Sequence, residues 1–197
     1  MIFTGILTAA GYSSRMGALK ALLPWKGMTL VRYQVTILKQ GGCDEIVLVT
    51  GHRSEDIRAE LFDLEVSFVE NFDYQSGRVS SVKEGIKSAS SDTNAFVLLA
   101  VDQPRTPDII NSLINSHATS DPIVTSPRFN SKGGHPVVFS SSIKTEILSI
   151  TEETEGLRSV FEKYRDEMNE VHFEDPIVRL DLNTYEDYEK ARVTYGS

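Results

Sequence analysis

Residues 2–20 read IFTGILTAAGYSSRMGALK, an apolar run that leads directly into a loop rich in small and cationic residues. The nearly continuous apolar residues up to Thr8 predict a strand that is buried on both faces of a sheet. The loop that follows matches neither G-x-G-x-x-G nor G-x-x-x-x-G-K-[ST], the two common phosphate-binding patterns. Its composition nevertheless suits a polyphosphate.

The loop holds the parts of a phosphate cradle. Two glycines let the backbone turn its amides inward, two serines add hydrogen-bond donors, and two cations supply positive charge. The cations matter because the chain as a whole carries a formal net charge of −8. The candidate phosphate-binding residues are Gly11, Ser13, Ser14, Arg15, Gly17 and Lys20.

Downstream of the loop, apolar runs alternate with segments of helical spacing. We expect strands at 45–51, 66–71 and 95–102, and helices at 29–40, 54–62, 81–88 and 106–117. In the second helix Phe62 is expected to face inward, and Ser81 with Glu84 forms a plausible capping box for the third. This alternation predicts an α/β fold with a parallel sheet covered on both faces.

The remainder is less regular. It predicts strands at 122–129, 135–140, 171–174 and 178–182, and helices at 143–150, 156–168 and 185–195. In open sheets of this type, ligands bind beyond the carboxyl ends of the strands. Gly51, Asn71, Asp102 and the glycine-containing loop all follow predicted strands, so we expect them at one edge of the sheet.

Composition restricts the function further. The length of 197 residues and the 40% hydrophobic content predict a single soluble domain that spans residues 1–197. The negative net charge argues against nucleic acid and anionic membranes as partners. Cys43 is the only cysteine, which excludes an intrachain disulfide and favours a reducing compartment, so we expect a cytoplasmic protein. No run approaches the roughly 20 apolar residues of a membrane helix.

Six further motifs follow the A-A-G-x-S-x-R-M-G-x-x-K loop in a familiar order. They are LPWKG (23–27), VTGH (49–52), Asn71-x5-Gly77 with SSV (80–82), VDQP (101–104), GHPVVF (134–139) and LDLNTYED (180–187). Together they resemble the molybdenum-cofactor nucleotidyltransferases, which attach CMP or GMP to molybdopterin. The resemblance implies a Rossmann-like, three-layer α/β/α nucleotidyltransferase domain, GT-A-like, with a mostly parallel sheet.

The resemblance also implies a reaction. A phosphate oxygen of the acceptor attacks the α-phosphorus of a nucleoside triphosphate and pyrophosphate leaves, which requires in-line positioning and charge neutralisation. Arg15 and Lys20 would stabilise the leaving group, and Asp102 with Asp181 would bind Mg²⁺, which prefers oxygen ligands. His135 would face the acceptor. By the same resemblance the nucleobase would be held by Ala9, Ala10, Gly11, Gly51, Ser80 and Ser81.

Ala10 and Gln103 resemble the cytidylyl members of the family and favour CTP over GTP, with molybdopterin as acceptor and a molybdoenzyme receiving the product. Arg78, Tyr185 and the Lys132–His135 segment depart from the family pattern, and the departures at Arg78 and at Lys132–His135 leave the acceptor open. Guanylyl transfer or a sugar- or polyol-phosphate acceptor stays as an alternative. A nicotinamide- or flavin-dependent oxidoreductase and a non-catalytic nucleotide-binding accessory protein are the alternatives from other classes.

Overall fold

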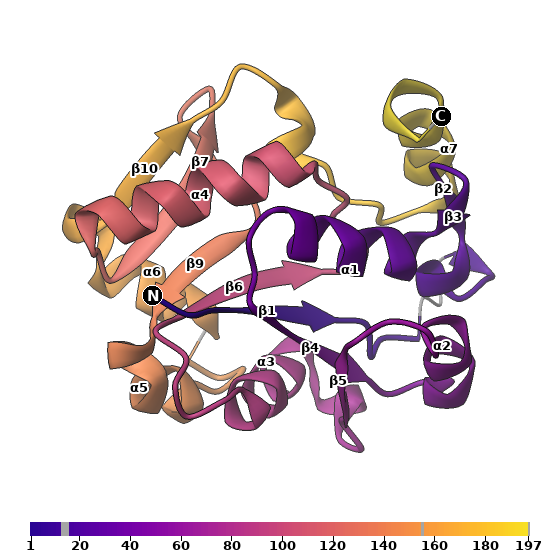
Figure 1. Ribbon diagram of the computed structural model, residues 1–197, viewed down its shortest axis with the longest axis horizontal. Helices are drawn as coiled ribbons and strands as arrows, with labels where there is room; N and C mark the ends of the chain where they lie inside the picture. The colour runs from indigo at the N-terminus through magenta and orange to yellow at the C-terminus, as the bar shows by residue number, and fades with distance from the viewer. Residues whose placement is uncertain (13–15, 155, 197) are drawn as a thin grey trace.

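A central sheet organises the protein, whose computed structural model describes residues 1–12, 16–154 and 156–196 (Figure 1). Its strands are β1 (Phe3–Thr8), β4 (Glu45–Thr50), β5 (Ser67–Glu70), β6 (Ala95–Ala100), β7 (Val124–Phe129), β8 (Lys132–Gly133), β9 (Val137–Ser140) and β10 (Asn169–His172). They lie in the order β10-β7-β9-β6-β1-β4-β5, with β8 paired to β7. β1 is parallel to both β4 and β6, whereas β9 is antiparallel to β6 and β7. A short hairpin of β2 (Pro24–Trp25) and β3 (Met28–Thr29) stands apart.

Helices cover both faces of this sheet (Figure 1). The apolar side chains of α1 and α4 belong to one core cluster, and those of α3, α5 and α6 belong to a second. Such continuous burial explains why the central strands read as unbroken apolar runs. The helices are α1 (Leu30–Gln40), α2 (Ser54–Glu60), α3 (Arg78–Ser88), α4 (Pro107–Ser120), α5 (Lys144–Ser149), α6 (Leu157–Lys163) and α7 (Tyr185–Tyr195), joined by short 3-10 segments η2 (Lys20–Leu22), η3 (Tyr74–Ser76), η4 (Ser141–Ile143), η5 (Arg165–Glu167) and η6 (Pro176–Arg179).

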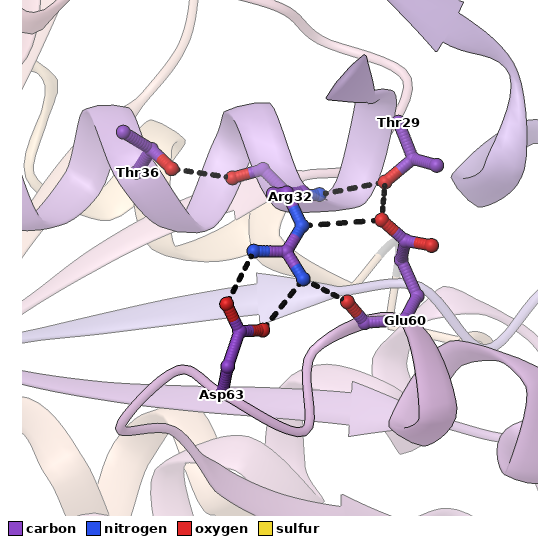
Figure 2. Close-up of polar contacts among 5 residues, drawn as sticks. All are labelled: Thr29, Arg32, Thr36, Glu60 and Asp63. Carbon is purple, nitrogen blue, oxygen red and sulfur yellow. Dashed lines mark hydrogen bonds and ion pairs between the residues drawn. The ribbon is translucent and has the colours of Figure 1, made fainter.

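An arginine on α1 ties this helix to the end of α2 (Figure 2). Arg32 Nε donates to Glu60 Oε1 at 3.1 Å, and Arg32 Nη2 donates to Asp63 Oδ1 at 2.6 Å and to the Glu60 carbonyl. Thr29 caps α1 by accepting from the Arg32 amide and also donates to Glu60. The planar guanidinium satisfies several acceptors at once, so the cluster fixes how α1 and α2 pack.

Most of the expected elements are confirmed. Strands β1, β4 and β6 form where the apolar runs predict them. Helices α1, α4 and α7 form where the helical spacing predicts them. Trp25 is buried against Tyr33 and Tyr188, so this side chain packs within the core. The predicted α/β class, with helices on both faces of a mostly parallel sheet, is therefore confirmed.

Three local predictions are wrong. Phe62 is 85% exposed, because α2 ends at Glu60 and the chain has already left the helix. Ser81 does not cap α3, since that helix begins at Arg78 after Gly77 and places Ser81 inside. Residues 178–182 do not add a strand: η6 covers 176–179, and the following residues pass beside Asp102 outside the sheet. None of the described helices has the length and apolar character needed to cross a lipid bilayer.

Candidate active site

A cleft of about 380 Å³ opens beyond the carboxyl ends of β1 and β6. Its walls come from the loop after β1, the loop after β6, the N-terminal turn of α3 and the turn before β9. This is the edge at which parallel α/β sheets bind their ligands. Seven of the sequence-predicted residues line it: Ala9, Ala10, Gly11, Lys20, Ser81, Asp102 and His135.

The backbone at the start of the loop is fixed by the neighbouring strand. The Ala9 amide donates to the Val49 carbonyl at 2.8 Å, and the His52 amide donates to the Ala10 carbonyl at 3.0 Å. Ser13, Ser14 and Arg15 lie outside the described residues. Gly17 adopts a φ of +66°, which favours glycine, but it does not line the cleft.

Lys20 and Asp102 meet inside the cleft. Lys20 Nζ lies 2.8 Å from Asp102 Oδ2, and the two side chains are only 12% and 13% exposed. Asp102 follows β6, whose end is held by the Gln34 side chain, because Gln34 Nε2 donates to the Ala100 and Val101 carbonyls. The sequence predicted a catalytic role for each residue separately, and the structure brings the two together as an ion pair.

Asp181 approaches this pair from the C-terminal part of the chain. The Leu182 amide donates to the Asp102 carbonyl at 2.8 Å, so the backbone after Asp181 lies beside Asp102. The Asp181 side chain itself is exposed and does not line the cleft, whereas Asn183 does. Among the described residues there is no group of three or more His, Cys, Asp or Glu side chains that could hold a metal ion.

His135 lines the cleft as a largely buried imidazole. Burial, followed by the nearby positive charge of Arg105, lowers the pKa of His135 to about 4, against the opposing effect of Asp181. The imidazole is therefore neutral at physiological pH. A neutral ring can donate or accept a hydrogen bond, but it does not add a positive charge to the site.

The predicted nucleobase residues divide into two groups. Ser81 lines the cleft, and Asn71 Nδ2 donates to both Ser80 Oγ and Ser81 Oγ at 2.9 and 3.0 Å. Gly51 and Ser80 do not line it. A Cβ at Gly51 would lie 2.9 Å from both the Ala10 carbonyl oxygen and the Tyr74 ring, so packing of the loop requires glycine there.

Sequence reasoning missed an aromatic wall of the cleft. Tyr12 and Tyr74 both line it, with ring centroids 5.2 Å apart, and the His52 ring lies 4.5 Å from that of Tyr12. Tyr74 lies within the Asn71-x5-Gly77 motif, and Tyr12 lies within the glycine-containing loop. Both therefore stood inside segments already singled out, but nothing in their spacing marked them as neighbours.

Comparison with known proteins places the chain in one family, whose members carry names of different activities. A family model described as the MobA-like NTP transferase domain matches residues 5–168. Nicotine blue oxidoreductase of Paenarthrobacter nicotinovorans is 32% identical over 163 residues, which are 79% of this chain and 79% of that protein. Molybdenum cofactor cytidylyltransferase of Escherichia coli (strain K12) is 28% identical over 191 residues, 96% of this chain and 95% of that protein. Among solved structures, Rv0371c from Mycobacterium tuberculosis H37Rv superposes with a TM-score of 0.85 at 24% identity and covers 96% of each chain.

Proposed function

The chain belongs to the MobA-like NTP transferase family, and from this premise we propose that it transfers CMP from CTP to a phosphorylated acceptor, with molybdopterin as the favoured acceptor. The family model is named for transfer from nucleoside triphosphates. The observation that carries the proposal is the Lys20–Asp102 pair in the cleft at the sheet edge. The Lys20 ammonium could bind phosphate there, and the neighbouring Asp102 carboxylate could bind a metal ion.

In the proposed reaction an acceptor phosphate oxygen forms a bond to the α-phosphorus, and the bond from the α-phosphorus to the pyrophosphate oxygen breaks. The protein's contribution is alignment and charge neutralisation. Loop amides near Ala10 and Gly11 would cradle the phosphates. Lys20 would exchange Asp102 for the triphosphate and neutralise the departing pyrophosphate together with Arg15.

The loop's Gly11 supports a ligand here. Among the described residues, which leave out 13–15 of this loop, no atom lies within 4 Å of a Cβ built at position 11, and Gly11 does not have a positive φ. Close approach of a ligand to the backbone supplies a reason for glycine here, because only glycine leaves the amide uncovered.

The residues near Asp102 fit Mg²⁺. This ion is commonly held by one or two protein carboxylates together with substrate phosphates and water. Asp102 lines the cleft and the backbone after Asp181 lies beside it, so the carboxylates of these two residues would be the protein ligands. When bound, Mg²⁺ would offset negative charge on the phosphates.

The choice of CTP rests on Ala10 and Gln103, both of which line the cleft. Gln103 Oε1 accepts a hydrogen bond from the Ala100 backbone amide at 3.1 Å, which orients this cleft-lining side chain. The choice of molybdopterin rests on the cytidylyltransferase relative, which aligns over nearly the whole chain. GTP and other phosphorylated acceptors are the alternatives within the same reaction.

An oxidoreductase is the second candidate function. The relative at 32% identity favours it, since that protein is named for a redox reaction. The aromatic wall formed by Tyr12 and Tyr74 could contact a planar ring in either case. The two functions differ in the ligand that must bind first: a nucleoside triphosphate or a redox cofactor.

Calorimetric titration with CTP, GTP, ATP and NADH, each with and without Mg²⁺, separates these functions. We expect CTP to bind most tightly and to gain affinity from Mg²⁺. Preferential binding of GTP would change the transferred nucleotide, and binding of NADH alone would replace nucleotidyl transfer by the oxidoreductase. A positive result with CTP leads to an assay of pyrophosphate release with molybdopterin.

A further inference from the structure

Arg105 is a buried cation that has no assigned role in the proposed reaction. It follows the Asp102-Gln103-Pro104 segment and precedes α4, and its exposure is 0%. Arginine is almost never fully buried unless it is paired. Burial lowers the pKa of Arg105 to about 10, against the opposing effects of Asp181 and Asp102, so the group stays protonated at neutral pH.

The guanidinium connects its own segment to two distant segments of the chain. Nε donates to the His135 carbonyl at 2.7 Å, and Nη1 donates to the Pro104 and Leu180 carbonyls, both at 2.8 Å. Each accepting carbonyl belongs to a candidate site residue or lies close to one: His135 itself, Leu180 directly before Asp181, and Pro104 two residues after Asp102. The planar guanidinium thus bridges the loops that carry Asp102, His135 and Asp181.

The surrounding backbone makes this arrangement tight. The His135 amide donates to the Val178 carbonyl and the Leu182 amide to the Asp102 carbonyl, each at 2.8 Å. A Cβ at Gly134 would lie 2.2 Å from the Val178 carbonyl oxygen, so the turn before β9 presses directly on η6. Arg105 Nη2 has no hydrogen-bond partner among the described residues. The cation is therefore held by carbonyls and balanced by the nearby carboxylates.

We propose that Arg105 is a positioning residue that sets the placement of Asp102, His135 and Asp181 relative to one another. Its charge stays beside the two carboxylates when Lys20 turns from Asp102 toward the triphosphate. The two carboxylates then keep a permanent positive neighbour. This inference rests on the proposed function for its catalytic consequence, but the positioning itself can be tested without activity.

The test compares Arg105→Lys with wild type, because lysine keeps the charge but cannot reach three carbonyls with one planar group. Arg32→Lys is the matched control, since Arg32 also binds several acceptors but lies outside the cleft. Hydrogen exchange measures the His135 and Leu182 amides. We expect both to exchange at least about tenfold faster in Arg105→Lys than in wild type or in Arg32→Lys. Unchanged exchange at both amides would overturn the proposal.

Kinetics supply the second readout. In Arg105→Lys we expect kcat to fall by about tenfold or more while KM for CTP stays within about twofold, because the loop that would cradle the phosphates is untouched. A variant that keeps wild-type kcat despite a lower Tm would show that Arg105 only packs. If wild type itself does not transfer CMP, the proposed function fails, and the exchange rates still decide the positioning role.

A measurement on wild type covers the case in which Arg105→Lys does not fold. The Arg105 Nε–H, observed by nitrogen-15 NMR, is expected to exchange slowly with solvent because it is buried on the His135 carbonyl. Its resonance should shift when Mg²⁺ and CTP are added together. Fast exchange, or a resonance that does not move, would contradict a positioning role.

Discussion

Lys20 Nζ lies 2.8 Å from Asp102 Oδ2, although the two residues are 82 positions apart in the chain. Lys20 begins η2 after the glycine-containing loop, and Asp102 follows the central strand β6. The pair is mostly buried, so its electrostatic attraction is stronger than that of a surface ion pair. Under the proposed function, a triphosphate in the cleft would compete with Asp102 for Lys20.

Replacing Lys20 by alanine should reduce the rate of nucleotidyl transfer by about 100-fold or more, since one preorganised charge on the leaving group is lost. The measurement is kcat for pyrophosphate release. Lys26→Ala is the control, because Lys26 is exposed and does not line the cleft. Equal rates in Lys20→Ala and wild type would remove Lys20 from the reaction.

Asp102→Asn should leave the fold intact and reduce Mg²⁺-dependent transfer to about 1% of wild type or less, because an amide is a much poorer magnesium ligand. Asp166→Asn, at an exposed carboxylate of η5, should keep full activity. Circular dichroism checks the fold of both variants. Full activity of Asp102→Asn would exclude this carboxylate as a metal ligand.

Two glycine variants separate ligand approach from packing. Gly11→Ala should keep wild-type stability, because its Cβ meets no atom of the described part of the chain within 4 Å, but should weaken CTP binding by about tenfold. Gly51→Ala should lower stability by about 1–3 kcal/mol, because its Cβ would lie 2.9 Å from Ala10 and from Tyr74. Urea unfolding and calorimetric titration measure the two effects. Unimpaired CTP binding by Gly11→Ala would contradict the phosphate-binding role of the loop.

His117 should make stability depend on pH. It is buried and paired with Thr125 Oγ1 at 2.9 Å, and burial lowers its pKa to about 4 from the ordinary value of 6.5. Between these values the unfolded chain binds more protons, so stability is fully present above the unfolded pKa and is lost as the pH falls toward 4. From pH 7.5 to 4 this amounts to about 3 kcal/mol.

His117→Gln removes this titration. The variant should therefore lose about 3 kcal/mol less stability than wild type over the same pH interval, as measured by urea unfolding at both ends. His135, whose pKa is lowered in the same direction, is present in both proteins and cancels in the comparison. Equal losses in the two proteins would show that His117 is not held neutral by burial.

Much of the fold could be predicted because its signals are local. The buried strand β1 is an apolar run, α1 has a threonine N-cap and a glycine end, and the alternation of strands and helices dictates a largely parallel sheet. Phe62 shows where local reasoning fails. The apolar residue fits the helical spacing, but α2 ends two residues earlier, and helix ends depend on tertiary contacts such as the Arg32–Glu60 pair.

The candidate site, like the fold, could be predicted only in part. Residues in the glycine-containing loop and after β6 could be singled out because loops at strand ends carry function. The contact between Lys20 and Asp102 could not be predicted, since it depends on how η2 folds back over the sheet edge. Arg105 was missed because a single arginine after a proline reads as a surface charge. Its importance appears only when the distant carbonyls of His135 and Leu180 converge on it.

The most direct test of the central claim follows CTP labelled at its α-phosphate during incubation with the protein, Mg²⁺ and molybdopterin. Nucleotidyl transfer predicts that the label moves into the acceptor and that one pyrophosphate is released for each label transferred. Lys20→Ala and Asp102→Asn should each suppress both products. Tight CTP binding with no label transfer to any phosphorylated acceptor, or hydrolysis to CMP alone, would contradict the claim.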